Sequence, residues 1–247
     1  MGPKNKDEVF NKALGGEIST YIQPIINLQA NSIEGWEMLT RGPLGTTLEM
    51  PSRLFSYARR KKKMRQLEYQ CLNNSLMATQ MLNSKSKVFI NISSLIFCEK
   101  LDMITNYAAD LNNCSIVLEI TESHKSNISR VIDAANWYKS KGISIAVDDV
   151  SSGYDRLKNI LYVKPEYFKL ERDLIMDCHK NIDKRIMIKS LLLMGNKLGS
   201  RVIAEGVETK YEVNILRSLG VKLCQGYYFS KPFPAVTLKD ITTANII

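Results

Sequence analysis

The chain has 247 residues, of which 45% are hydrophobic and 24% are charged, an ordinary globular balance that allows one large core. The sequence contains no apolar run of about eighteen residues, so it predicts no membrane span. The N-terminus has no apolar secretory stretch, and the five cysteines are scattered without a C-x-x-C pair. We therefore expect free thiols and a cytoplasmic location.

The net charge of +9 favours an anionic partner. The densest positive cluster is Arg59-Arg60-Lys61-Lys62-Lys63 with Arg65, for which a solvated helix face is the simplest interpretation. Aromatic residues do not interleave with this cluster, so direct binding of nucleic acid is not favoured. The sequence has only two histidines, which argues against a His-rich metal hydrolase and against a Ser-His or Cys-His triad.

Strand-like and helix-like segments alternate along the chain. We predict strands at 19–28, 32–40, 87–92, 115–121, 143–149, 166–170, 200–205 and 221–225. The first two are joined by the short turn Gln29-Ala30-Asn31-Ser32, which leaves no room for a helical crossover. They should therefore pair in antiparallel fashion.

The intervals after the second strand carry helical sequence. We predict helices at 52–65, 66–84, 127–141, 182–198 and 209–219. Several of these segments begin at a capping residue, such as Thr209, or end at a glycine, such as Gly199 or Gly220. With no linker or low-complexity tract, residues 1–247 should form a single domain. The predicted fold is an α/β, TIM-like (β/α)₈ barrel with one antiparallel strand near the N-terminus.

Polar residues close the apolar runs at or near the C-terminal ends of the predicted strands. They are Glu37, Asn91, Glu119, Asp148, Lys169, Glu205 and Gln225. In a parallel barrel the C-terminal strand ends meet at one face, where active sites are found. We therefore expect these side chains to converge at one barrel mouth.

The chemistry of this set suits hard divalent cations. Glu37, Asn91, Glu119 and Asp148 offer oxygen ligands, and Asp149 adds another carboxylate. Such a group repels itself unless cations neutralise it, and oxygen ligands without His or Cys favour Mg²⁺, Mn²⁺ or Ca²⁺. Two ions about 3.5–4 Å apart could bind a phosphodiester and activate a water molecule. Lys169 could orient that water or stabilise charge on the phosphate.

Each of these residues also has a purely structural interpretation. Asn91 could cap the next helix, Lys169 could extend to solvent, and Gln225 could be a turn residue. An isolated acid after a strand usually caps a helix or solvates a loop. Their joint occurrence favours a shared site, and the adjacent pair Asp148-Asp149 is its strongest component.

The same residues lie in motifs that resemble the EAL-type cyclic-di-GMP phosphodiesterase domain family over the whole chain. In order, these motifs are Glu37-Met38-Leu39-Thr40-Arg41, Ile90-Asn91-Ile92-Ser93, Leu118-Glu119-Ile120-Thr121-Glu122-Ser123, Ala146-Val147-Asp148-Asp149, Lys169-Leu170-Glu171, Ala204-Glu205-Gly206-Val207-Glu208-Thr209 and Gln225-Gly226-Tyr227-Tyr228-Phe229-Ser230-Lys231-Pro232. Seven motifs in the family's order are far more specific than one short match.

The resemblance implies hydrolysis of cyclic di-GMP to linear pGpG with two Mg²⁺ or Mn²⁺ ions per site, and inhibition by Ca²⁺. The residues that match the first metal site are Glu37, Asn91, Glu119 and Asp148, and Asp149 matches the second. Lys169 matches the contact to the catalytic water, and Glu205 and Gln225 match further catalytic positions. It also implies phosphate binding by Arg41, loop anchoring by Glu122 and a supporting role for Glu208. A homodimer and a regulatory protein partner are further expectations.

Three positions depart from the family pattern. Met38 replaces an alanine, the loop Val150-Ser151-Ser152-Gly153 replaces one that usually begins Phe-Gly, and Glu171 stands in place of an aspartate. The altered loop supports an alternative: a catalytically weak or inactive cyclic-di-GMP receptor, or a protein-interaction module on the same fold.

Overall fold

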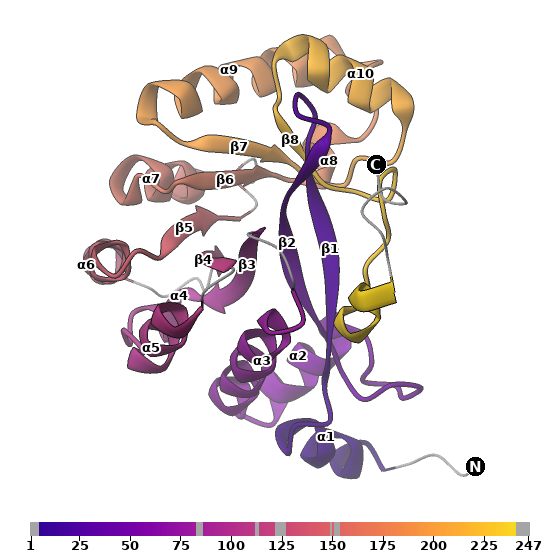
Figure 1. Cartoon of the computed structure of the whole chain (residues 1–247), viewed down its shortest axis with the longest axis vertical. Coiled ribbons are helices and arrows are strands. Elements are labelled where there is room, and N and C mark those ends of the chain that lie inside the picture. Colours follow the sequence, from indigo (N-terminus) through magenta and orange to yellow (C-terminus); the bar gives the residue numbers. More distant parts are fainter. Residues whose placement is uncertain are drawn as a thin grey trace.

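The computed structural model describes residues 5–82, 86–111, 114–121, 127–148, 150 and 154–240. Eight of its strands close into a barrel surrounded by helices, and a short ninth strand extends the same sheet (Figure 1). The strands are β1 Ser19–Asn27, β2 Ser32–Arg41, β3 Ser86–Ser93, β4 Cys114–Thr121, β5 Ser144–Val147, β6 Tyr167–Leu170, β7 Arg201–Ala204, β8 Leu223–Cys224 and β9 Phe233–Pro234.

The first strand runs against the rest of the barrel. Neighbouring strands from β2 to β8 are parallel, whereas β1 is antiparallel to both β2 and β8. The strand β9 pairs with Tyr21 and Ile22 of β1. The predicted TIM-like barrel with one antiparallel strand near the N-terminus is thus confirmed. The strands β5 to β8 are shorter than predicted.

The helices largely follow the predicted intervals. They are α1 Lys6–Leu14, α2 Pro51–Arg60, α3 Met64–Thr79, α4 Ser94–Phe97, α5 Asp102–Asp110, α6 Ile128–Ser140, α7 Tyr154–Val163, α8 Arg172–Ile175, α9 Ile182–Leu198 and α10 Lys210–Leu219. Thr209 and Glu212 form a capping box at α10, and Gly220 ends that helix in the left-handed region at φ 91°. No helix among the described residues is long and apolar enough to span a bilayer.

The boundary between α2 and α3 lies earlier than predicted. The sequence suggested one helix through residue 65, but Lys62 has φ 55°, which interrupts the helix between Arg60 and Met64. The run of basic residues therefore occupies a corner between two helices. It does not form a single helix face.

The barrel wall is packed on both sides. Inside lie Ile25, Phe89, Val117, Ala146, Tyr167, Ile203 and Leu223, which form one buried cluster. Residues that alternate with these along the strands, such as Val88, Ile90 and Ile116, pack outward against the helices. This alternation continues toward the C-terminal ends of the strands. The side chain of Glu119, two residues beyond Val117, therefore also belongs to the inner face.

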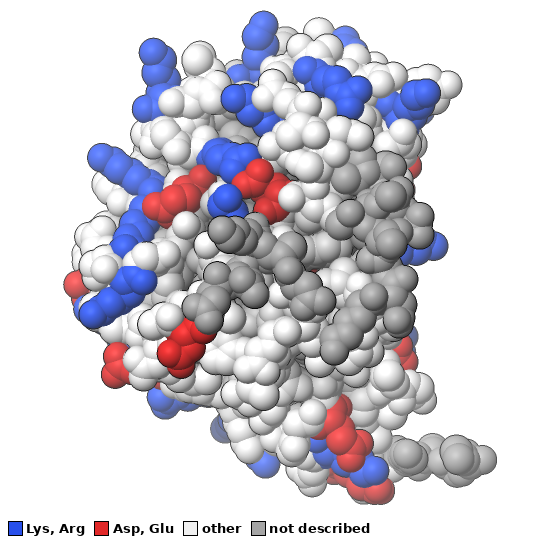
Figure 2. Space-filling view, viewed as in Figure 1, with Lys and Arg blue, Asp and Glu red and all other residues white. Residues whose placement is uncertain are grey.

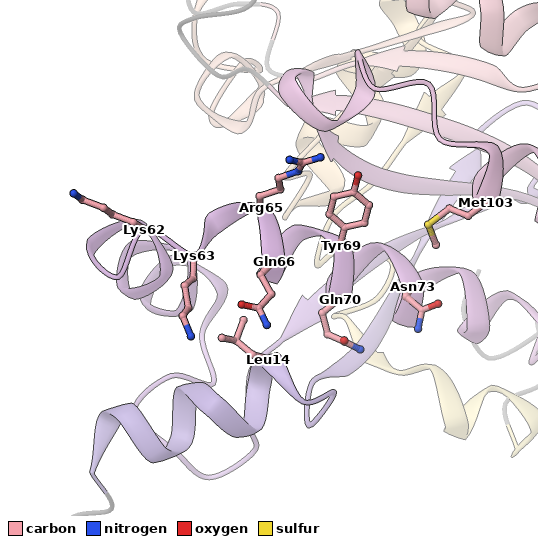
Figure 3. Close-up of a pocket in the computed structure, with 9 residues that line it drawn as sticks. All are labelled: Leu14, Lys62, Lys63, Arg65, Gln66, Tyr69, Gln70, Asn73 and Met103. Atoms are coloured by element: carbon pink, nitrogen blue, oxygen red, sulfur yellow. The ribbon is translucent and has the colours of Figure 1, made fainter.

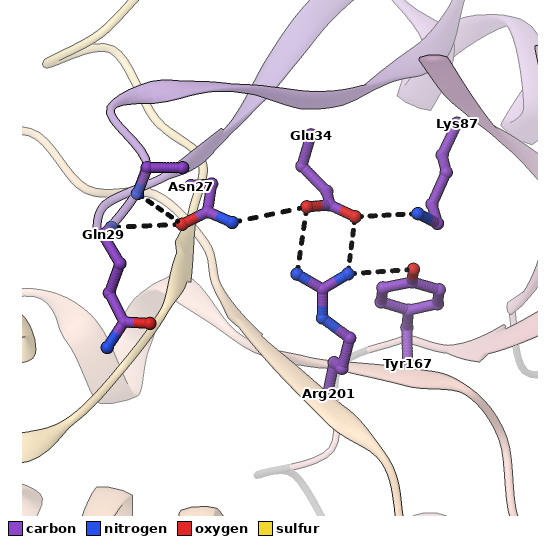
Figure 4. A network of polar contacts seen from close by, with 7 residues as sticks. Asn27, Gln29, Glu34, Lys87, Tyr167 and Arg201 are labelled. Carbon is purple, nitrogen blue, oxygen red and sulfur yellow. Dashed lines mark hydrogen bonds and ion pairs between the residues drawn. The ribbon is translucent and has the colours of Figure 1, made fainter. Parts of the chain in front are cut away.

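An ionic network closes the end of the barrel where the parallel strands begin. The Arg201 guanidinium on β7 contacts both carboxylate oxygens of Glu34 on β2, at 2.5 and 3.0 Å (Figure 4). Lys87 on β3 lies 2.9 Å from the same carboxylate. The hydrogen bond from Arg201 and the contact with Lys87 outweigh burial and lower the pKa of Glu34 to about 2. This network lies at the opposite end of the barrel from the polar strand ends.

Candidate functional site

A buried lysine lies at the centre of the barrel mouth. The Lys169 side chain is completely buried, and its Nζ atom lies 2.7 Å from Glu119, 2.8 Å from Glu205 and 3.4 Å from Glu37. These four residues come from β6, β4, the end of β7 and β2. The structure thus brings side chains from strand ends far apart in the sequence into direct contact.

A chain of amides holds Glu37 from the other side. Gln225 Nε2 donates to Glu37 Oε2 at 2.6 Å and to Gln23 Oε1 at 3.0 Å. Gln23 Nε2 donates in turn to the Ser230 carbonyl, and Asn91 Nδ2 donates to Glu37 Oε1 at 3.0 Å. Sequence reasoning missed Gln23, which lies opposite Glu37 in the antiparallel register of β1 and β2. A polar residue within the apolar segment from Tyr21 to Ile26 of β1 was the available signal.

The structural alternatives for these residues do not apply. Ser93, rather than Asn91, caps α4 by accepting a hydrogen bond from the Ile96 amide. Lys169 does not reach solvent, and Gln225 is only 3% exposed and bonded to two side chains. The arrangement is a shared buried cluster.

The cluster carries more negative than positive charge. Carboxylate oxygens of Glu119, Asp148 and Glu205 lie within 4.8 Å of one another. Burial raises the pKa of Glu119 well above its usual range and that of Glu205 to about 8, despite the attraction of Lys169. Burial acts to lower the pKa of Lys169, but the carboxylates outweigh it and raise that pKa. Without a further cation, the cluster therefore retains a proton on an acid and keeps its lysine charged.

The donor set fits a hard divalent cation. Both oxygens of Glu119 and Oε1 of Gln225 are buried without a hydrogen-bond partner in the described part of the chain, although Glu119 Oε1 does contact Lys169. Such acceptors are costly to leave unpaired. The three clustered carboxylates could hold Mg²⁺, Mn²⁺ or Ca²⁺, together with Glu37, to which the Asn91 amide is bonded.

A cleft of about 460 Å³ leads to this cluster, lined by Gln23, Glu37, Arg172, Glu205, Gly206, Glu208, Gln225, Gly226 and Tyr227. Two glycines shape it. Gly206, which follows Glu205, has φ 65°, a conformation that favours glycine. A Cβ atom on Gly226 would lie 2.1 Å from the Val207 carbonyl oxygen, so only glycine permits this close approach beside Gln225.

The remaining predicted residues lie around the mouth. Arg41 stacks on Tyr21, with 5.1 Å from its guanidinium carbon to the ring centre. Glu208 forms an ion pair with Arg172 at 2.9 Å. Glu171 stands at the N-cap position of α8 without a side-chain capping bond. Glu208 lines the cleft, and Arg41 and Glu171 lie at the C-terminal ends of β2 and β6, outside the buried cluster.

Asp149 and residues 151–153 of the loop after β5 lie outside the described residues. Glu122, in the loop after β4, also lies outside them. Val150 is described and is 1% exposed. Its amide donates to the Lys169 carbonyl at 3.1 Å, which ties the start of this loop to β6. The smaller side chain at this position is therefore packed into the core.

Three side chains of the basic cluster, Arg60, Lys61 and Arg65, make local contacts. Lys61 pairs with Asp7 and Arg65 with Glu99, and Tyr57 lies beneath Arg60 and Lys61. Aromatic rings thus contact these cations, although none interleaves with the basic run in the sequence. Lys63 and Gln66 point toward Leu14 across an open groove between α3 and α1 (Figure 3). On the face shown in Figure 2, positive side chains are scattered among neutral ones.

Comparison with known proteins places the chain in a family. A cyclic di-GMP phosphodiesterase of Pseudomonas aeruginosa, NbdA, is 27% identical over 96% of this chain and 32% of its own length. The chain spans about a third to a half of the length of the first curated relatives that it matches.

Solved structures agree with the fold. An EAL domain protein of Listeria monocytogenes superposes with a TM-score of 0.84 at 22% identity, covering 96% of both chains. A standalone EAL protein of Vibrio cholerae, solved bound to c-di-GMP, has a TM-score of 0.73 at 28% identity, covering 87% of this chain and 92% of the other. The sequence model of the EAL domain matches residues 7–232. The chain therefore belongs to the EAL domain family.

Proposed function

We propose that this chain hydrolyses cyclic di-GMP to linear pGpG with the help of bound divalent cations, and that residues 1–247 act as one domain in the cytoplasm. The observation that carries the proposal is the buried contact of Lys169 with Glu119, Glu205 and Glu37, beside a Glu119 Oε2 atom that has no hydrogen-bond partner among the described residues. Relatives named as cyclic di-GMP phosphodiesterases support the substrate.

Glu37, Asn91, Glu119 and Asp148 would hold a first Mg²⁺ or Mn²⁺ ion, and Asp149 a second. A bound cation supplies charge neutralisation for the phosphodiester and increases the acidity of water at the site. Gln225 and Asn91 fix both oxygens of Glu37 by donating hydrogen bonds to them. Glu205 shares the Lys169 ammonium with Glu119.

Lys169 keeps a positive charge inside the cluster, where it can donate a hydrogen bond to the attacking oxygen or to a phosphate oxygen. Arg41 at the rim would contact a substrate phosphate. Glu208 would support the loop that carries Glu205 through its pair with Arg172, and Glu122 would anchor the loop after β5.

The test is incubation with cyclic di-GMP and Mg²⁺ or Mn²⁺, with products separated by chromatography. Linear pGpG should accumulate, and Ca²⁺ should support binding without turnover. Glu37→Gln should lose about 100-fold or more in turnover, because it loses a charged ligand. Glu34→Gln removes an acid from the opposite end of the same strand and should retain turnover. Absence of pGpG with both metals would contradict the proposal.

The altered loop at Val150 favours a second candidate, a receptor that binds cyclic di-GMP without hydrolysing it. Calorimetry that gives nucleotide binding without any product would support the receptor. Absence of nucleotide binding would instead support a protein-interaction module. The proposed homodimer is tested separately, by measuring the mass of the particle in solution against the 28.1 kDa chain.

A further inference from the structure

A half-buried acid that the proposed function does not use ties α3 to the barrel mouth. The carboxylate of Glu68 on α3 accepts a hydrogen bond from Ser93 Oγ at 2.7 Å. Burial raises the pKa of Glu68, and the bond from Ser93 opposes that rise. The Glu68 carboxylate thus points to the end of β3.

Its partner Ser93 has two roles in the turn between β3 and α4. It is the last residue of β3 and the N-cap of α4, where its Oγ accepts from the Ile96 amide at 3.4 Å. A hydroxyl group has one proton to donate, and here that proton points to Glu68. The hydrogen bond to Glu68 therefore fixes the orientation of the group that begins α4.

The same turn carries Asn91. This residue lies two positions before Ser93 on the same face of β3, and its amide donates to Glu37 at 3.0 Å. A cavity of about 70 Å³ lies beside the turn and is lined by residues that include Glu68, Ser93, Asn91 and Thr121. The turn therefore lacks complete packing on this side, where the hydrogen bond from Ser93 to Glu68 links it to α3.

We propose that Glu68 is a positioning residue for the cation site: through Ser93 it fixes the β3–α4 turn and thereby the amide of Asn91 beside Glu37. The inference rests on the proposed function for the role of the cation, but the tether itself is independent of catalysis. It extends the site from the strand ends to a helix on the outside of the barrel.

The first test compares Mn²⁺ affinity by calorimetry in Glu68→Ala, Glu68→Gln and Glu34→Gln. Glu68→Ala should bind Mn²⁺ about 10-fold more weakly, as is typical when a group that orients a metal ligand is lost. Glu68→Gln keeps an acceptor oxygen for Ser93 and should restore most of the affinity. Glu34→Gln removes a structural acid at the far end of the barrel and should leave Mn²⁺ affinity unchanged even where the melting temperature falls.

A second measurement needs neither metal nor turnover. The side-chain amide signals of Asn91 in the NMR spectrum, identified by their loss in Asn91→Ala, should shift in Glu68→Ala and in Ser93→Ala but not in Glu34→Gln. Ser93→Ala provides the test if Glu68→Ala does not fold.

Unchanged Asn91 signals and Mn²⁺ affinity in folded Glu68→Ala or Ser93→Ala would overturn the inference. An equal loss of Mn²⁺ affinity in Glu34→Gln would also overturn the inference, because it would show that lower stability of the fold alone weakens Mn²⁺ binding. A wild-type chain that forms no pGpG, yet shows the shifted Asn91 signals in the variants, would contradict the proposed function alone.

Discussion

Lys169 stands out because a fully buried ammonium group contacts three carboxylates at 2.7 to 3.4 Å. Its charge would compete with any cation that the same acids bind. Burial of an ammonium group costs free energy of folding, and buried charges of this kind are concentrated at functional sites.

Replacement of Lys169 separates its effect on cation binding from its effect on turnover. Lys169→Met should retain or strengthen Mn²⁺ binding, because it removes a competing positive charge, yet lose about 100-fold or more in turnover. Calorimetry and initial-rate measurements on the same preparation check both parts. A variant that loses Mn²⁺ affinity and turnover together would show that Lys169 mainly organises the acids.

At this scale the sequence predicted which residues converge but not all their contacts. Period-two alternation places Glu119 and Val117 on the same face of β4, so the polar strand ends could be identified without a structure. Gln23 could not be found in this way, because its position depends on the register of β1 with β2. That register is set by the hairpin geometry and includes an irregularity at Ile25 and Ile26.

Among the elements, the loop from β8 brings Gln225 to the site through an unusually close backbone approach. Gly226 lies against Val207, whose amide donates to the Gln225 carbonyl at 3.0 Å. The loops after β7 and β8 thus hold each other, and the strands themselves are only four and two residues long.

We therefore expect Gly226→Ala to displace this pair of loops. The added methyl group would meet Val207 backbone atoms at 2.1 to 2.7 Å, a clash that flexible side chains cannot relieve. Turnover should fall more than Mn²⁺ affinity, because Gln225 orients Glu37 while the other acids remain. An unchanged melting temperature and unchanged turnover would contradict this view of the loops.

Glu34 links β2 and β7 across the opposite end, and its pKa of about 2 gives a pH-dependent contribution. Since the folded pKa lies below the ordinary 4.5, this contribution is complete above pH 4.5 and is lost as the pH falls toward 2. Glu34→Gln should reduce the free energy of unfolding by about 2 kcal/mol at pH 7, a value lowered for partial exposure. Urea titrations at several pH values should show the difference from wild type shrinking below pH 4.5. A difference that does not vary with pH would exclude the ionic origin.

Element boundaries were predicted less well than element types. The interruption at Lys62 breaks a basic run that has uniform helical propensity, so it could not be identified from the sequence. The helix α1 was missed because its apolar residues, Val9, Phe10 and Ala13, are few and polar residues surround them. They form a second cluster with residues of α2 and α3, including Leu54 and Leu67.

For the molecule as a whole, a cation bound only by the folded barrel should stabilise it. At a free Mn²⁺ concentration about 100 times the dissociation constant, the gain is about 2.7 kcal/mol. For a chain of this size that corresponds to a rise of roughly 5–10 °C in the melting temperature. Calorimetric scans with and without Mn²⁺ check this, and Glu119→Gln should abolish most of the rise. A rise of equal size in that variant would place the ion elsewhere.

The ionic network at the far end of the barrel also has a kinetic consequence. Glu34 and Arg201 are 167 residues apart, and their contact forms only when β7 is in place beside the hairpin. The entropy of closing so long a loop makes this contact a late event in folding. Loss of the contact should therefore speed unfolding and leave the refolding rate nearly unchanged, with a φ-value near zero. The contact between β2 and β7 would then help to set the lifetime of the folded barrel.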